Sequence, residues 1–230
     1  MTSTPPSIIA IDGPAASGKS TVGEAVSQRL GFLYFDTGAM YRAVTQAALA
    51  RGIPIADEAA VGELAATIHI DVMAPTVDDG RQYTVLIDGE DVTWALRTAV
   101  VDANVSAVSA YPAVRTALTR QQRRIAAQGR VVMVGRDIGT VVVPEAPLKI
   151  YLDASPEERA HRRWLELQQR GQDADPEAIL TAMRARDAYD STRKTAPLRA
   201  ASDAIIIDTD GMSGGQVVDE VMRLAERFEG

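Results

Sequence analysis

The chain has 230 residues, of which 46% are hydrophobic and 24% charged, and its formal net charge at pH 7 is −7. This composition is typical of a globule with one domain and excludes a disordered chain, and no apolar run approaches the ~18 residues of a membrane span. The absence of cysteine excludes disulfides and thiolate metal sites, and the acidic balance argues against general binding of nucleic acid.

We expect neither a membrane nor a nucleic acid as partner. Residues 1–6 contain no Lys or Arg, so we do not expect a secretory signal there, and we expect a cytoplasmic location.

The first elements in chain order alternate between short apolar runs and helical patterns. Residues 19–30 place apolar side chains at helical spacing and end at Gly31, and residues 39–50 form a second helical pattern. Continuous apolar strands separated by helices indicate a parallel sheet that is covered on both faces. The apolar runs are residues 8–11, 32–35, 131–134, 148–152 and 205–207.

Residues 83–93 interrupt this alternation. The dipeptide Asp88-Gly89 between two short runs is typical of a two-residue hairpin turn, so we expect an inserted subdomain at about residues 57–98. Further along, the segment from Ser155 to Glu158 predicts a helix start with a capping box, and Ser213 opens the last helix in a similar way.

Residues 13–20, with the sequence GPAASGKS, match the G-x-x-x-x-G-K-[ST] pattern between a strand and a helix. Such a loop surrounds the β-phosphate with backbone N–H groups and the positive end of the helix dipole. Lys19 would bridge the β- and γ-phosphates, and Ser20 would offer its hydroxyl to Mg²⁺. The expected ATP contacts are Gly13, Pro14, Ala15, Ala16, Ser17, Gly18, Lys19, Ser20 and Thr21.

Two polar segments follow predicted strands directly, residues 36–42 and residues 135–140. The carboxyl ends of parallel strands form the ligand crevice of such sheets, so we expect both segments beside the phosphate loop. The alternative interpretations are a solvated, helix-capping turn and an Arg–Asp pair on the surface. A guanine-specific switch is disfavoured, because the single asparagine, Asn104, is followed by Val105 and cannot form the N-K-x-D motif.

Arginines recur on the two helices predicted after Ser155. Arg159 and Arg163 are four residues apart and share a helix face, and Arg186, Asp190 and Arg193 follow on or after the next helix. We predict a helical lid whose cations close on the triphosphate. An exposed, ion-paired helix face is the alternative.

Together these segments resemble the bacterial cytidylate kinase branch of the nucleoside monophosphate kinases over nearly the whole chain. The matching segments are residues 12–21, 36–42, 88–92, 135–142, 152–155, 158–160, 186–191 and 196–198. The resemblance implies an α/β P-loop kinase fold: a five-stranded parallel sheet flanked by helices, an insert with a small antiparallel sheet, and a helical lid. The implied ranges are a core domain at 1–38, 107–155 and 192–230, a monophosphate-binding insert at 39–106, and a lid region with the following helix at 156–191.

The resemblance also implies transfer of the ATP γ-phosphoryl group to CMP or dCMP with Mg²⁺. We expect this transfer to be direct and in line, and we expect the protein to be a monomer. Asp36 would hold the Mg²⁺ through water. The implied acceptor contacts are Arg42, Arg136 and Arg193 with Thr37 and Tyr41 for the phosphate, Ser106, Arg115 and Asp137 for cytosine, and Arg186 and Asp190 for the ribose. The implied catalytic residues are Lys19, Arg42, Arg136, Arg159, Arg163 and Arg193. The alternatives are a P-loop kinase for UMP, AMP or shikimate, and a nucleotide-binding regulatory protein.

Overall fold

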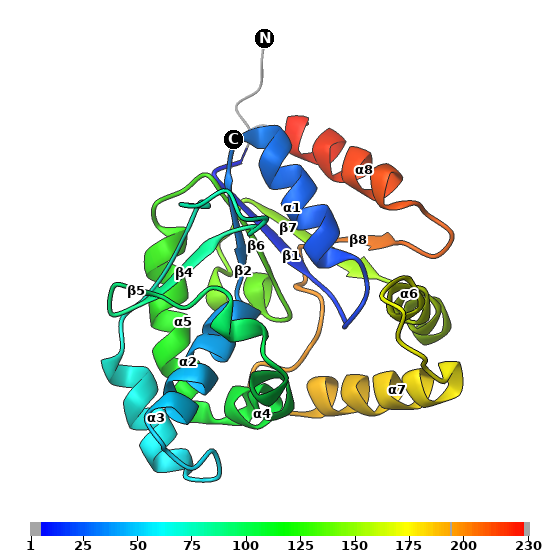
Figure 1. Cartoon of the computed structure of the whole chain (residues 1–230). Helices are drawn as coiled ribbons and strands as arrows, with labels where there is room; N and C mark the ends of the chain where they lie inside the picture. Colours follow the sequence, from blue (N-terminus) through cyan, green and yellow to red (C-terminus); the bar gives the residue numbers. More distant parts are fainter. Residues whose placement is uncertain (1–5, 194, 228–230) are drawn as a thin grey trace.

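The computed structural model describes residues 6–193 and 195–227, and the outermost residues of the predicted core ranges lie outside it (Figure 1). A five-stranded sheet forms its centre, with all strands parallel in the order β2-β6-β1-β7-β8. Each strand occupies one of the predicted apolar runs, which confirms the expected parallel sheet. The strands are β1 (Ile8–Asp12), β2 (Leu33–Asp36), β6 (Val131–Gly135), β7 (Leu148–Asp153) and β8 (Ile205–Asp208).

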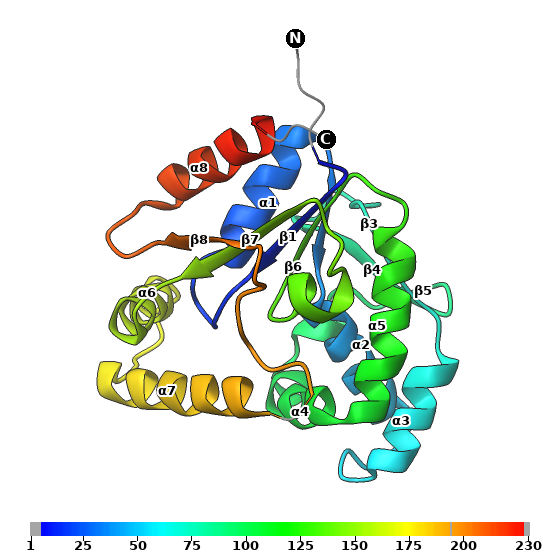
Figure 2. The same cartoon turned by 180° about the vertical axis from the view of Figure 1, so that it is seen from behind.

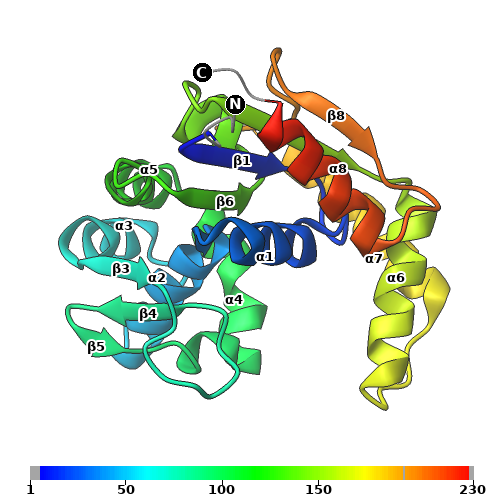
Figure 3. The same ribbon diagram turned by 90° about the horizontal axis from the view of Figure 1, so that it is seen from above.

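Helices cover both faces of this sheet. The helix α1 (Lys19–Leu30) packs against α8 (Gly214–Glu226) on one face (Figure 1). The helix α5 (Pro112–Ala126) lies on the opposite face, seen from behind in Figure 2, so that β6 lies between α1 and α5 in Figure 3. Coverage on both faces explains why Ile9 and Met133, from neighbouring strands, are fully buried.

A second sheet lies apart from the first and is antiparallel, in the order β3-β4-β5. Asp88 and Gly89 form the predicted turn between β4 and β5, and both have the positive φ, 52° and 88°, that the tightest hairpin turns require. The elements of this region are α2 (Gly38–Ala50), α3 (Glu58–Thr67), β3 (Ile70–Met73), β4 (Thr84–Ile87), β5 (Glu90–Asp91), the short 3₁₀-helix η1 (Ala95–Arg97) and α4 (Ala99–Ala110).

The helices α6 (Pro156–Gln169) and α7 (Pro176–Thr192) pack on each other. They project from the side of the main sheet that is opposite to the small antiparallel sheet (Figure 3). Ser155 caps α6 by accepting a hydrogen bond from the Glu158 N–H at 3.2 Å. The predicted capping box is wrong, because the Glu158 carboxylate instead accepts from Arg162 at 2.8 Å and the Ser155 N–H donates to Asp210 at 2.9 Å. A charged partner one turn along the helix is the stronger donor for that carboxylate.

No helix within the described ranges is both long enough and apolar enough to span a bilayer.

The helix α8 begins with the capping box predicted at Ser213, whose hydroxyl accepts from the Gln216 N–H while the Gln216 side chain accepts from the Ser213 N–H. Arg29 of α1 and Asp219 of α8 form an ion pair at 2.6 Å, which joins the two helices across this face.

Candidate active site

A cavity of about 470 Å³ lies at the carboxyl ends of β1, β2 and β6, and the phosphate loop, α2, α4, α5, α6 and α7 all contribute to its walls. Both polar segments predicted to lie beside the phosphate loop meet here. The predicted site residues that line this cavity are Ala15, Ala16, Lys19, Ser20, Asp36, Thr37, Tyr41, Arg42, Ser106, Arg115, Arg136, Asp137, Arg163, Arg186, Asp190 and Arg193.

Five predicted ATP contacts and one predicted lid arginine do not line the cavity. They are Gly13, Pro14, Ser17, Gly18, Thr21 and Arg159. Gly13 packs against the backbone of Leu152. Its φ is 151°, and a Cβ there would lie 2.2 Å from the carbonyl oxygen of Leu152. Only glycine fits so close an approach, so the first residue of the motif has a steric role.

Lys19 opens α1, and only 8% of the residue is exposed. Its Nζ donates to the carbonyl oxygen of Pro14 and lies 3.3 Å from the Ser17 hydroxyl. Burial lowers the pKa of Lys19 to about 7, with further lowering by Arg136 and Arg159, while Asp12 and Asp36 act in the opposite direction. The neutral amine of Lys19, populated at and above this pKa, can therefore take up a proton and become an ammonium when an anion approaches.

This pKa predicts proton uptake when ATP binds. Phosphate oxygens beside Nζ favour the charged lysine and raise its pKa, so at pH about 8.5 binding is expected to take up about one proton. Calorimetric titrations in buffers of different ionisation enthalpy measure that proton. In Lys19→Arg the guanidinium is charged at every pH used, so the uptake should disappear; the same uptake in both proteins would contradict the assignment.

One side of the cavity is organised around Asp190, of which only 7% is exposed. Its carboxylate lies 2.6 Å from Nε of Arg136, 3.6 Å from Nη1 of Arg193 and 4.0 Å from Nε of Arg186. Nη2 of Arg193 is buried and has no hydrogen-bond partner among the described atoms. One carboxylate thus gathers three of the predicted cations, and one guanidinium retains an unused donor.

Arg42 lies on α2 at the edge of the same cavity and is paired with Asp102 of α4, while also donating to the carbonyl oxygen of Leu96 at 3.3 Å. The sequence interpretation missed Asp102, because nothing in the chain order associates α4 with α2. Only the packing of these two helices brings the acid to the arginine.

Arg115 and Asp137 form a buried ion pair at 2.5 Å on the cavity wall, with 6% and 9% of their side chains exposed. The Arg115 guanidinium also lies over the Tyr41 ring, 5.4 Å from its centre. Ser106 lies on α4 and is exposed at the cavity. Without the resemblance, Arg115 would be assigned to a helix surface, and its burial overturns that interpretation.

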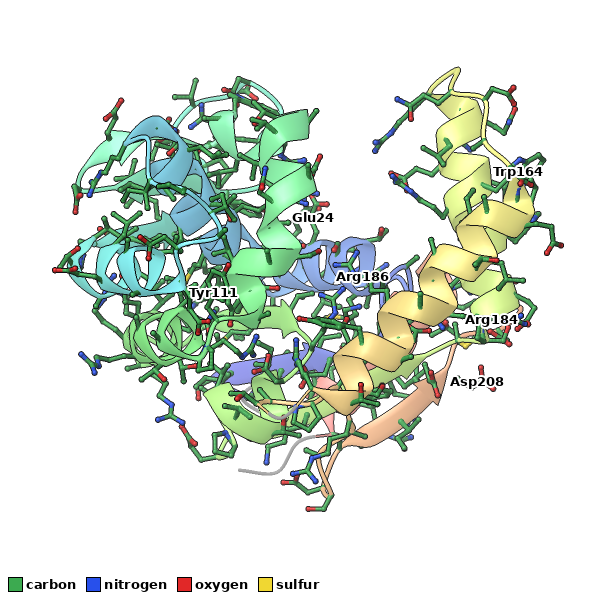
Figure 4. All side chains as sticks on the ribbon, turned by 90° about the horizontal axis from the view of Figure 1, so that it is seen from below. Glu24, Tyr111, Trp164, Arg184, Arg186 and Asp208 are labelled. Atoms are coloured by element: carbon green, nitrogen blue, oxygen red, sulfur yellow. The ribbon has the colours of Figure 1, made fainter. Side chains whose placement is uncertain are left out.

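Arg159 lies on α6 and contacts the phosphate loop. Only 2% of it is exposed, and its guanidinium donates to the carbonyl oxygens of Ala15 at 3.1 Å and Ala154 at 3.0 Å. It also forms two hydrogen bonds with Asp187 of α7, at 3.1 and 2.5 Å. Arg163, one turn further along α6, lines the cavity and pairs with Glu166 at 2.7 Å. Figure 4 shows Arg186 on the inner side of α7 and Arg184 on the other side.

Two ion pairs between α6 and α7 differ chiefly in burial, which allows a matched stability prediction. Asp187→Asn is expected to lower the free energy of unfolding by about 3 kcal/mol, because it leaves the buried charge of Arg159 without its partner. This is the low end of the range for a buried pair, since the Asp187 side chain is 23% exposed. Glu157→Gln removes the exposed pair with Arg184 and should change little. Urea unfolding of both variants measures the difference, and equal effects would contradict this argument.

Ser20 and Asp36 place a hydroxyl and a carboxylate in the same cavity, and these oxygens suit Mg²⁺. One oxygen of Asp36 accepts from the Gly38 N–H at 2.9 Å. Within residues 6–193 and 195–227 there is no cluster of three or more acidic, His or Cys side chains able to hold a metal by themselves. The donors fit an ion that takes most of its ligands from phosphates and water.

Comparisons with known proteins agree with this geometry. A family model described as "Cytidylate kinase" matches residues 9–227. The chain is 54% identical over 223 residues to a cytidylate kinase of Chloroflexus aggregans, covering 97% of this chain and 94% of that one. It is 52% identical over 224 residues to a cytidylate kinase of Herpetosiphon aurantiacus, covering 97% and 96%.

A solved structure of an uncharacterized protein from Eubacterium ventriosum is similar in fold, with a TM-score of 0.52 and 11% identity over 96% of this chain and 98% of that chain. The structure of TT1252 from Thermus thermophilus is similar at a TM-score of 0.51 and 17% identity, covering 98% of this chain and 100% of that chain. At these identities the likeness concerns the fold alone.

Proposed function

The chain belongs to the cytidylate kinase family, and from that membership we infer that it transfers the γ-phosphoryl group of ATP to CMP or dCMP. The observation that supports this most directly is one cavity that joins Lys19 of the phosphate loop to the buried Arg115–Asp137 pair and to the cations around Asp190. On this assignment the donor and acceptor sites would share one space, as direct transfer between two nucleotides requires.

We propose that the acceptor phosphate binds Arg42, Arg136 and Arg193, with Thr37 and Tyr41 beside it. Arg193 supports this role through its buried and unpartnered Nη2, which can donate to a phosphate oxygen without breaking an existing bond. Arg136 is already held by Asp190, so little side-chain freedom would be lost on binding.

The ribose would meet Arg186 and Asp190, and cytosine would meet Ser106, Arg115 and Asp137. Cytosine presents an exocyclic amine beside the N3 and O2 acceptors. The Asp137 carboxylate can accept from the amine, while Arg115 and Ser106 donate to the ring.

The transfer would be direct and in line, with no covalent enzyme intermediate. Lys19 and Arg163 would stabilise charge that develops on the transferred group, together with the arginines that hold the acceptor. The acceptor phosphate is already anionic, so the reaction needs no strong general base. The burial of Arg159 favours a role in holding the phosphate loop through Ala15 over direct contact with the γ-phosphate.

We propose that Mg²⁺ accompanies the nucleotide and is held by Ser20 directly and by Asp36 through water. When bound, this ion would neutralise negative charge on the phosphates. We further propose that the protein acts as a monomer in the cytoplasm, with ATP and CMP or dCMP as its small-molecule partners and no role in binding nucleic acid.

A panel of acceptors tests the proposed function. The purified protein is incubated with ATP, Mg²⁺ and CMP, dCMP, UMP, AMP or shikimate, and release of ADP is followed by a coupled assay. We expect CMP and dCMP to give the highest kcat/KM. Equal or faster turnover of another acceptor would assign a different small-molecule kinase, and slow hydrolysis unaffected by any acceptor would favour a regulatory nucleotide-binding protein.

A further inference from the structure

Asp12 is a buried acid to which none of the roles above is assigned. It is the last residue of β1, the central strand, and directly precedes Gly13 of the phosphate loop. Only 4% of it is exposed. Its carboxylate accepts two backbone hydrogen bonds from the segment after β6, one from the Ile138 N–H at 2.8 Å and one from the Gly139 N–H at 2.7 Å.

These two N–H groups belong to the start of a five-residue π-helix, η2 (Ile138–Val142). The first N–H groups of a helical turn have no partner inside the turn, so buried ones need an acceptor from elsewhere. Asp12 supplies both acceptors with the two oxygens of one side chain. Burial raises the pKa of Asp12 to about 6, whereas the two N–H donors favour its ionised form.

Gly139 lies close to both Lys149 and Asp12. A Cβ on Gly139 would lie 3.2 Å from Cδ and 3.3 Å from Cγ of Lys149, which is tight, and 3.4 Å from Oδ2 of Asp12, which is an ordinary contact. The backbone at Ile138 and Gly139 is thus held by the Asp12 carboxylate, and the Lys149 stem only lies beside it.

Asp137 immediately precedes the segment that Asp12 holds. Its carboxylate lies 2.5 Å from Arg115 on the cavity wall, so its place depends on the backbone from which it projects. We propose that Asp12 is a positioning residue that holds the Ile138–Gly139 backbone so that Asp137 meets the acceptor base. The strand that carries the donor loop would thereby also set the base selectivity. This inference rests on the proposed function, because it requires Asp137 to read that base.

The first test is Asp12→Asn in the full-length protein. The amide has nearly the size of the carboxylate, but only its oxygen can accept, and its NH₂ group would face one of the two backbone N–H groups. We measure kcat/KM for CMP and for UMP, the KM for ATP and the Tm. The CMP-over-UMP preference should fall about tenfold or more, since a displacement of about 1 Å can cost about a hundredfold in rate. A lower Tm with an unchanged preference would overturn the proposal.

A double-mutant cycle with Asp137→Asn asks whether Asp12 acts through Asp137. If it does, Asp12→Asn adds nothing to the preference already lost in Asp137→Asn. Losses that multiply in the double variant would overturn the proposal. Asp203→Asn serves as the matched control, because it removes the carboxylate 2.6 Å from Nζ of Lys149 without touching the 138–139 backbone. A fall in preference as large in this control as in Asp12→Asn would also overturn it.

Gly139→Ala decides the question if Asp12→Asn does not fold. The added methyl group crowds the Lys149 stem and reaches the Asp12 carboxylate, so the 139 backbone should shift while the charge of Asp12 stays in place. The preference should again fall, and an unchanged preference would overturn the proposal. The wild-type protein separates the two levels of inference. Equal use of CMP and UMP by the wild type contradicts the proposed function. A wild type that prefers CMP, with a preference insensitive to Asp12 and Gly139, contradicts this inference alone.

Discussion

Lys19→Ala is expected to lower kcat at least about a hundredfold while the protein remains folded, which is the scale of losing one strong contact to a transition state. Lys19 is a buried amine of the phosphate loop, at the cavity where the phosphates of ATP are expected to lie and to favour its charged form. The measurement is turnover at saturating ATP and CMP, with circular dichroism and Tm recorded on the same samples.

Folding should survive this change, since the buried ammonium has its pKa lowered by desolvation and is not itself a source of stability. Lys19→Arg is the companion variant, because it keeps the charge but not the slender ammonium group. It should lie between the wild type and Lys19→Ala. Near-normal turnover of Lys19→Ala would refute the assigned phosphate cradle.

Asp137→Ala is expected to lower kcat/KM for CMP about a hundredfold or more while changing the KM for ATP little. A site built on hydrogen bonds to its substrate discriminates strongly against any analogue that leaves the buried groups of the site unpaired. Uracil has a carbonyl where cytosine has its amine, so the wild-type carboxylate should reject UMP and the variant should lose that rejection. Steady-state kinetics with CMP, UMP and ATP test this directly.

Asp137→Ala also lowers the stability of the protein, because it leaves the buried guanidinium of Arg115 without its acid. The Tm of Asp137→Ala is therefore expected to fall, and kinetics must be recorded well below it. Asp137→Asn keeps an oxygen near Arg115 and should unfold closer to the wild type, yet still lose the preference for CMP. An equal loss for CMP and ATP in both variants would remove Asp137 from the base pocket.

The elements that were predictable from the sequence are those whose signal is local. Residues 19–30 carry a helical apolar pattern and end at Gly31, and α1 has those bounds with Gly31 as a left-handed cap. The turn at Asp88-Gly89 needs two positive φ values, which that dipeptide supplies. The strand β3 was not predicted, because Asp71 interrupts its apolar residues and its place is defined by pairing with β4 further along the chain.

The candidate site was predictable where a motif lies at a strand end, and not where it depends on a distant partner. Arg115 lies on a polar helix, and its buried partner Asp137 is 22 residues away in the sequence. Arg159 faces inward because Asp187 lies across from it on α7. Asp12 has a local signal in the sequence, because it is an acid at the end of an otherwise apolar strand. The two N–H groups that donate to it are 126 and 127 residues away in the sequence, beyond any local pattern.

The arrangement around Asp190 has a consequence for attempts to redesign this enzyme. Since one acid lies near Arg136, Arg186 and Arg193 together, replacing any one of them redistributes the attraction felt by the others. Variants changed at a single position would then lose part of this charge cluster, and the free-energy effects of the separate substitutions would not be additive. New acceptors are more accessible to libraries that exchange the acid and its arginines as one block.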